Sequence, residues 1–213
     1  MIAGLPYDAE IEYLEGTGTQ YVDTGIIPFD HRAVVEFQRP SATSKVGYIC
    51  AAYNINNCRF YPIFTYTEYE GKYFYISKPD NVHLYSKISD TQRHIVDYNS
   101  ENHYCYFDGN YVGATTAMPS SNLTNSVMLW CIINNGEAQN ISETRIFSVK
   151  LFDRIYNTLV CDLIPVRVGQ VGYMYDRVTR KLFGNAGTGA FVLGPDVATP
   201  VMGLRNYPEP EDA

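Results

Sequence analysis

Apolar and polar residues alternate with a period of two along most of this chain, and this alternation restricts its fold more than any other feature. Residues 144–153, TRIFSVKLFD, place Phe147, Val149 and Leu151 on one face, against Ser148 and Lys150 on the other. No apolar stripe with helical spacing extends beyond about two turns. Each periodic segment is therefore predicted to be a β-strand.

A hairpin is predicted within residues 103–113, HYCYFDGNYVG. Tyr104 and Tyr106 fall on one face of the first strand, and Asp108-Gly109 follows it. An Asp-Gly pair between alternating runs is a strong signal for a two-residue hairpin turn, because both residues tolerate positive φ. Further short strands are predicted over 33–38, 73–77 and 93–98.

Residues 126–133, SVMLWCII, are apolar at nearly every position. Such a run is typical of a central strand that is covered on both faces, so Trp130 is predicted to lie in the core. Short strands at intervals of about 8–12 residues predict an all-β fold, a two-sheet antiparallel jelly-roll sandwich. We assign residues 1–197 to this single domain and residues 198–213 to an exposed, proline-rich acidic tail.

The glycine-rich stretch GNAGTG, residues 184–189, raises the question of a phosphate site. Such a site uses backbone amides at the N-terminus of a following helix. Here a short strand-like run follows, and no Lys-Ser or Lys-Thr pair is present. The stretch is therefore interpreted as a turn and bulge between two strands.

Charge and composition exclude several classes of protein. The net charge is −7 and no cluster of Lys or Arg occurs, which argues against a nucleic-acid partner. The first residues lack the pattern of a signal peptide, and no run of about 18 apolar residues predicts insertion into a membrane. The five cysteines have irregular spacing and form no CxxC pair, so they are predicted to be reduced and mostly buried.

Two blocks, residues 11–28 and 145–196, resemble the laminin-G-like, concanavalin A-like domains of gut bacterial and bacteriophage proteins. The hairpin over 103–113 is similar to one that these domains carry before their central strand. The resemblance implies a two-sheet jelly roll in which the N-terminal strand pairs near the C-terminal one. It also implies binding to glycans or proteins, or a structural role, without a single activity.

No enzyme activity is predicted. Hydrolases of this fold carry paired acidic residues along one strand, in patterns that are absent here. The nearest pairs are Glu68 with Glu70, at an expected hairpin tip, and Glu10 with Glu12, on an expected edge strand. Neither pair has surroundings that predict a raised carboxyl pKa, and no nucleophile motif occurs.

Candidate ligand-binding residues come from a tyrosine-rich segment and an amide-rich turn. Tyrosine suits stacking on sugar rings and protein interfaces, although it also serves cross-strand packing. We expect truncation of Tyr66 or Tyr73 to weaken binding without unfolding the domain. The turns at 108–110 and 133–140 offer oxygen ligands for calcium, but Asn and Gly also favour turns, so no cofactor is predicted. The candidates are Tyr66, Tyr69, Tyr73, Asn134 and Asn135.

These features predict a non-catalytic binding or assembly module. The first hypothesis is a bacteriophage virion component, a capsid decoration, head fibre or tail-associated protein that adheres to glycans or to the host surface. The alternative is a carbohydrate-binding module of a bacterial surface or secreted protein, and a degenerate glycoside hydrolase is disfavoured. The expected partner is a glycan or a protein, and the sequence is compatible with a homo-oligomer.

Overall fold

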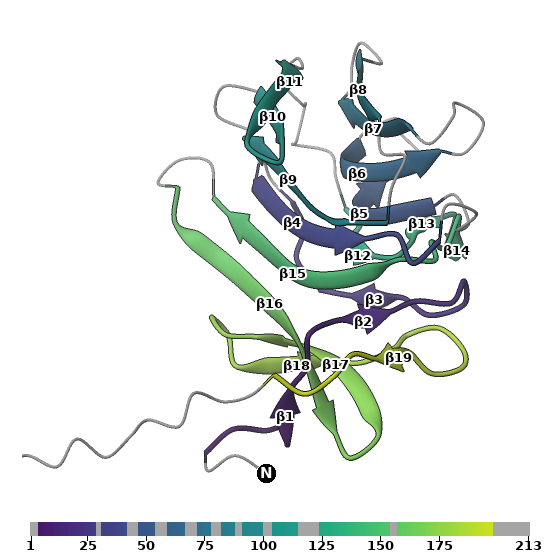
Figure 1. The fold of residues 1–213 in the computed structure, drawn as a ribbon, viewed down its shortest axis with the longest axis vertical. Helices are drawn as coiled ribbons and strands as arrows, with labels where there is room; N and C mark the ends of the chain where they lie inside the picture. The colour runs from purple at the N-terminus through teal and green to yellow at the C-terminus, as the bar shows by residue number, and fades with distance from the viewer. Residues whose placement is uncertain are drawn as a thin grey trace, which may run out of the picture.

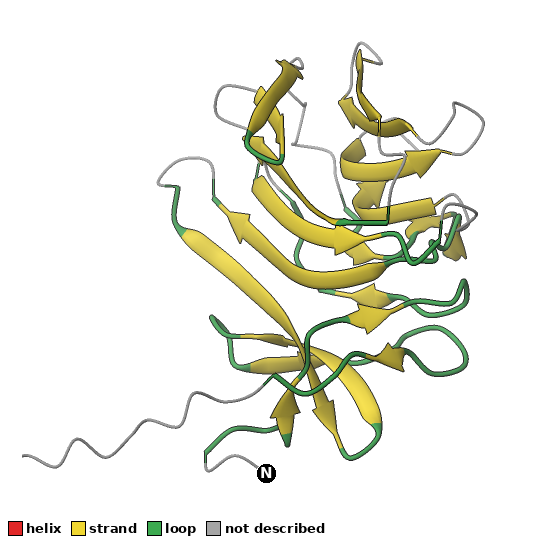
Figure 2. Ribbon diagram, viewed as in Figure 1, coloured by secondary structure: helices red, strands yellow, loops and turns green. Residues whose placement is uncertain are grey.

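The computed structural model describes residues 4–28, 31–41, 47–53, 59–66, 72–77, 82–87, 91–99, 104–114, 124–153 and 157–197. Within these ranges the chain forms strands, turns and loops and contains no helix (Figure 2). Accordingly, the described part of the chain offers no helix that is long and apolar enough to cross a membrane. The predicted all-β class is confirmed, whereas residues 198–213 lie outside the description.

Eleven strands form a large sheet in which every pairing between strands is antiparallel. Its main order is β11-β10-β9-β4-β15-β16-β17-β18, and β9, β4, β15 and β16 follow one another down Figure 1. The strands of this path are β4 (Arg32–Gln38), β9 (Arg93–Asn99), β10 (Tyr104–Phe107), β11 (Asn110–Ala114), β15 (Arg145–Phe152), β16 (Leu159–Val168), β17 (Val171–Asp176) and β18 (Lys181–Phe183).

Strands from the two ends of the chain complete the large sheet. β1 (Ala9–Glu10) pairs with β16, and β2 (Leu14–Glu15) pairs with both β15 and β19 (Val192–Leu193). The resemblance implied that the N-terminal strand pairs near the C-terminal one, and the contact between β2 and β19 confirms this expectation.

A six-stranded antiparallel sheet has the order β3-β12-β5-β6-β7-β8, and β13 pairs with β14 in a separate hairpin. Only the backbone pairing of β6, β7 and β8 is described. The bounds are β3 (Val22–Asp23), β5 (Gly47–Tyr53), β6 (Arg59–Tyr66), β7 (Lys72–Ser77), β8 (Val82–Lys87), β12 (Met128–Leu129), β13 (Ile132–Asn134) and β14 (Glu137–Gln139). The strands predicted over 33–38, 73–77 and 93–98 are confirmed as β4, β7 and β9.

One hydrophobic cluster contains buried side chains from the large sheet and from the six-stranded sheet. β4 contributes Val35 and Phe37, whereas β5 contributes Ile49 and Ala52. Along β4 every second residue is buried, as period-two alternation requires. The residues between them lie on the opposite side of the large sheet, which we call its outer face.

A β-bulge in β15 moves Phe147 away from the position that alternation predicts. Ile146 pairs with Phe37 and Ser148 pairs with Glu36, so Phe147 is the extra residue between them. Its ring lies 5.6 Å from that of Tyr13 and 4.0 Å below the Arg93 guanidinium. The prediction that Phe147 shares a face with Val149 and Leu151 was wrong, and Ile146 joins the core cluster in its place.

Trp130 interrupts the strand predicted over residues 126–133. Its φ is 69°, in the left-handed region, so the segment divides into β12 and β13. The run is nonetheless buried, and Trp130 is fully inaccessible. Its indole Nε1 donates to Thr144 O at 2.9 Å, and its ring lies 4.7 Å from that of Phe191. The continuous strand was a wrong prediction, whereas the core position of Trp130 is confirmed.

The glycine-rich stretch at 184–189 contacts the N-terminal segment. Ala186 N donates to Tyr21 O at 2.8 Å, and Thr188 N donates to Thr19 O at 3.0 Å. A Cβ on Gly187 would overlap Thr19 O and would lie 2.9 Å from the Tyr21 ring, so this position requires glycine. The amides of residues 186 and 188 thus bind protein carbonyls, which confirms the structural interpretation of the stretch.

Four of the five cysteines lie within the description, and all four are free and buried. Burial raises the pKa of the Cys50 and Cys161 thiols well above the usual range, and it raises the pKa of Cys105 and Cys131 to about 12.

We expect Cys50, Cys105, Cys131 and Cys161 to resist alkylation by iodoacetamide at neutral pH in the folded protein, because the thiolate is the reactive form. Mass spectrometry of the reacted protein, before and after addition of guanidinium chloride, measures this. All four should react only after unfolding, and fast labelling of any of them in the native state contradicts the prediction.

Candidate functional site

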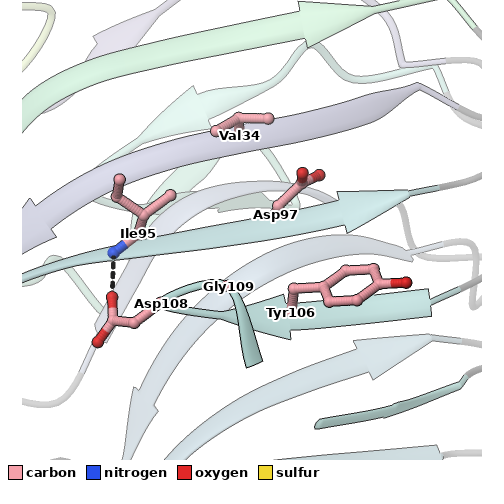
Figure 3. A pocket seen from close by; sticks show the side chains of 6 residues that line it. All are labelled: Val34, Ile95, Asp97, Tyr106, Asp108 and Gly109. Carbon is pink, nitrogen blue, oxygen red and sulfur yellow. Dashed lines mark hydrogen bonds between the residues drawn. The ribbon is translucent and has the colours of Figure 1, made fainter. Parts of the chain in front are cut away.

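The strongest candidate site is a hollow on the outer face of the large sheet. It has a volume of about 420 Å³. Strands β4, β9 and β10 place apolar, acidic and aromatic side chains around it, and the turn after β10 forms one border (Figure 3). The lining residues are Val34, Ile95, Asp97, Tyr106, Asp108 and Gly109.

A single row of cross-strand pairs runs across this face. Val34 pairs with Asp97, Asp97 pairs with Tyr106, and Tyr106 pairs with Tyr111. Directly paired residues share one face of a sheet, so the four side chains form a continuous line. Neighbouring strands lie about 4.8 Å apart, which gives the line a length of about 14 Å.

Three tyrosines from the β10–β11 hairpin pack against one another at one end of this row. The Tyr111 ring lies 5.3 Å from that of Tyr104 and 5.8 Å from that of Tyr106, both in edge-to-face geometry. Tyr104 is 39% exposed and Tyr111 is 58% exposed. Mutual packing restricts the rings while leaving aromatic surface in contact with water.

The Asp108-Gly109 turn that borders the hollow is held in place by the Asp108 carboxylate. Both residues have positive φ, at 48° and 76°, which confirms the predicted hairpin turn. Asp108 Oδ1 accepts a hydrogen bond from Ile95 N at 2.8 Å, drawn as the dashed line in Figure 3. Asp108 Oδ2 lies 2.7 Å from His94 Nδ1, which carries the hydrogen because a carboxylate only accepts. The turn is thereby fixed to β9.

Asp97 is paired with an arginine of the neighbouring strand. Arg32 Nε donates to Asp97 Oδ1 at 2.9 Å, and Arg32 Nη2 donates to Asp97 Oδ2 at 2.6 Å. This bidentate hydrogen bonding raises the pKa of Arg32, and the guanidinium also lies 5.0 Å above the Phe152 ring. The Asp97 carboxylate is therefore held in a fixed orientation at the hollow.

Two further arginines on the outer face each combine a carboxylate partner with an aromatic ring. Arg93 Nε lies 2.5 Å from Glu36 Oε1, and the Arg93 guanidinium lies above the Phe147 ring. Arg145 Nε donates to Glu15 Oε2 at 2.6 Å, and its guanidinium lies 4.4 Å above the Tyr13 ring. In both pairs the charge of the arginine is balanced by a carboxylate on the same face.

The candidates named from the sequence lie elsewhere in the fold. Tyr66 is in β6 and Tyr73 is in β7, where Tyr66 pairs with Lys72 and Tyr73 pairs with Thr65. These tyrosines are on neighbouring strands without being direct partners, and their side chains are outside the description. Tyr69 falls outside the described residues altogether, as do Glu68 and Glu70.

Asn134 and Asn135 belong to the β13–β14 hairpin. Asn134 Nδ2 donates to Gln139 Oε1 at 3.1 Å, and Asn135 has φ 53° next to Gly136 at 82°. These values confirm a turn. Among the described residues, no three His, Cys, Asp or Glu side chains form a group that could hold a metal ion.

Sequence reasoning found the 103–113 hairpin but did not identify its tyrosines as a site. The available signal was the spacing of Tyr104, Tyr106 and Tyr111 about the Asp-Gly turn, since a two-residue turn places residues 106 and 111 opposite each other. Nothing in the sequence indicated that Asp97 and Val34 lie next to Tyr106. Their positions depend on the register between strands that are far apart in the chain, and local sequence patterns do not specify it.

Comparisons with known proteins found a distant structural similarity. No protein-family model matches the sequence, and no curated protein matches it significantly. Two crystal structures of the NanB sialidase from Streptococcus pneumoniae, one of a mutant and one of a complex with an ethanesulfonate compound, superimpose with a TM-score of 0.45. Sequence identity is 11% and 10% over 89% and 88% of this chain, which corresponds to 40% and 39% of the sialidase. Similarity at this level carries no information about ligand or activity.

Proposed function

We propose that this chain is a non-catalytic binding module and that its ligand is a glycan held in the outer-face hollow. The observation that carries the proposal is the row of Val34, Asp97, Tyr106 and Tyr111 across three strand pairs. A sugar presents apolar C–H faces and polar hydroxyl edges. Tyrosine rings and Val34 suit the faces, and an oriented carboxylate suits the hydroxyls. A row of about 14 Å fits an oligosaccharide better than a single sugar.

The hydrogen bonds of the two aspartates support a non-catalytic role. A glycosidase needs one carboxyl group that presents a proton to the glycosidic oxygen. Here both oxygens of Asp97 accept from Arg32, and both oxygens of Asp108 are engaged by Ile95 N and His94. All four carboxylate oxygens therefore already take part in hydrogen bonds within the protein, which suits acceptors for sugar hydroxyls rather than a proton donor.

We further propose that the architecture is a two-sheet jelly-roll sandwich of the concanavalin A-like kind. The hydrophobic cluster shared by the large sheet and the six-stranded sheet supports this architecture. A virion component that adheres to a host surface, or a module of a bacterial surface protein, is the proposed setting. Both settings rest on the sequence resemblance, and both use the same binding face.

The test is a glycan-array screen followed by affinity measurements on Tyr106→Ala. Removing one aromatic contact is expected to raise Kd about tenfold, which corresponds to about 1.4 kcal/mol. Val171→Ala is the control, because Val171 is 55% exposed at the β16–β17 turn and does not line the hollow. Thermal melts of both variants separate lost binding from lost stability.

Tyr66→Ala and Tyr73→Ala belong in the same series, since they test the site proposed from the sequence. Glycan binding that depends on Tyr66 or Tyr73 but not on Tyr106 would place the ligand on the six-stranded sheet. A folded protein that binds no glycan on the array would leave assembly with a protein partner as the function.

A further inference from the structure

We infer that the hollow selects against negatively charged sugars and takes an uncharged glycan whose hydroxyl groups donate to Asp97 and Asp108. This inference rests on the proposed function, because it names the class of glycan for the same site. It follows from which charges line the hollow and from which lone pairs remain available on them.

Among the described residues, those that line the hollow include acidic side chains but no cationic one. Asp97 and Asp108 both line the hollow, and none of the other four lining residues is charged. Asp97 and Asp108 are 27% and 40% exposed, so a ligand in the hollow meets both carboxylates. A sugar carboxylate placed there would meet like charges within a few ångströms.

The two arginines nearest the hollow are already paired with carboxylates. Arg32 gives two hydrogen bonds to Asp97 and stacks on Phe152, and Arg93 pairs with Glu36 and stacks on Phe147. Lys150 is in register with Val34 on the neighbouring strand β15, and it does not line the hollow. An acidic sugar bound through Arg32 or Arg93 would share its guanidinium with a carboxylate that is already paired with it.

Both aspartates retain capacity to accept further hydrogen bonds. A carboxylate offers about four lone-pair sites. Asp97 uses two of them for Arg32, and Asp108 uses one on each oxygen for Ile95 N and His94. The remaining sites accept hydrogens from sugar hydroxyls, which an uncharged hexose supplies in number. A sugar carboxylate, by contrast, has no hydrogen to donate.

The experiment compares paired oligosaccharides that differ only at C6, where one has a hydroxymethyl group (hexose) and the other a carboxylate (hexuronic acid). Wild-type protein is expected to bind the hexose form at least about tenfold more tightly at low salt, a difference of about 1.4 kcal/mol. The preference should shrink in about 1 M salt, where the screening length falls to about 3 Å. The comparison at two salt concentrations uses wild-type protein only, so it does not depend on whether a variant folds.

Asp97→Asn tests the source of the selectivity. The variant removes the charge that neutralises Arg32, so we expect the preference to shift toward the hexuronic acid by about tenfold. Glu15→Gln is the matched control, because it removes one carboxylate from the Arg145 pair on the same face, outside the hollow. It should leave the preference unchanged.

The outcomes separate the two proposals. Equal or tighter binding of the hexuronic form by wild-type protein, through Tyr106, overturns the charge inference and leaves glycan binding intact. An identical shift in Asp97→Asn and Glu15→Gln also overturns it, since net charge alone would then explain the preference. Absence of any glycan binding by the folded protein overturns both proposals together.

Discussion

Replacement of Trp130 by alanine is expected to lower the free energy of unfolding by about 3–5 kcal/mol. The side chain is fully buried, so its removal leaves a cavity between Phe191 and Gly16. Thr144 O also loses the donor Nε1 at 2.9 Å. Domains of this size are stable by only about 5–15 kcal/mol, so the variant should lose a large part of the total. Urea denaturation followed by circular dichroism measures the change.

Trp130→Phe is the matched control for this experiment. It keeps an aromatic ring opposite Phe191 but removes the donor to Thr144 O, so we expect a smaller loss of about 2 kcal/mol. Equal losses in the two variants would show that the hydrogen bond, rather than the volume of the ring, dominates. A loss below about 1 kcal/mol in Trp130→Ala would contradict the assignment of Trp130 to the core.

Gly47→Ala is the second substitution with a large expected effect, a loss of about 3 kcal/mol. A Cβ at this position would lie 2.6 Å from Ser142 N and 2.7 Å from Ser142 Cα, and it would overlap Asn140 O. These are backbone atoms, so relief requires the 140–142 segment to move. That movement would stretch the hydrogen bonds from Tyr48 N to Asn140 O and from Ser142 N to Trp130 O.

Gly184→Ala is the comparison for Gly47→Ala, because the nearest atom to its Cβ belongs to a side chain. The Tyr173 ring lies 3.2 Å away, so relief requires a shift of only a few tenths of an ångström in a side chain. We expect a change within about 0.5 kcal/mol, in thermal or urea unfolding. Similar losses in the two alanine variants would mean that the backbone approach at Gly47 is not the cause.

Local patterns in the sequence predicted the strands and the hairpin turn well. Alternation along residues 33–38 and 93–98 reflects burial of one face, and Asp108-Gly109 adopts the positive φ values that such a turn requires. These features depend on residues within about ten positions of each other. The core position of Trp130 was predictable in the same way, because apolar residues surround it in sequence.

Features that depend on distant contacts were not predictable. The left-handed φ of Trp130 is stabilised by Ile49 O, Ser142 N and Thr144 O, which come from two other segments of the chain. The bulge that displaces Phe147 is determined by pairing with β4, about 110 residues earlier in the chain. The sequence analysis selected Tyr66, Tyr69 and Tyr73 because these residues are close together along the chain, whereas the residues of the hollow are not.

The hollow illustrates the difference between composition and register. Val34, Asp97 and Tyr106 are unremarkable residues one by one, and they form a row only because β4, β9 and β10 align in one register. A shift of one residue in β9 would replace Asp97 by a core residue. The candidate site is therefore a property of the sheet as a whole.

The pairing of β2 with β15 and β19 has a consequence for how the chain folds. Glu15 meets Arg145 across 130 residues, so the centre of the large sheet has a high contact order. A ribosome needs on the order of ten seconds to make that length of chain. β2 must therefore wait for its partners with apolar residues such as Leu14 unpaired, and folding of this sheet is expected to be slow and to finish only after β19 has left the ribosome.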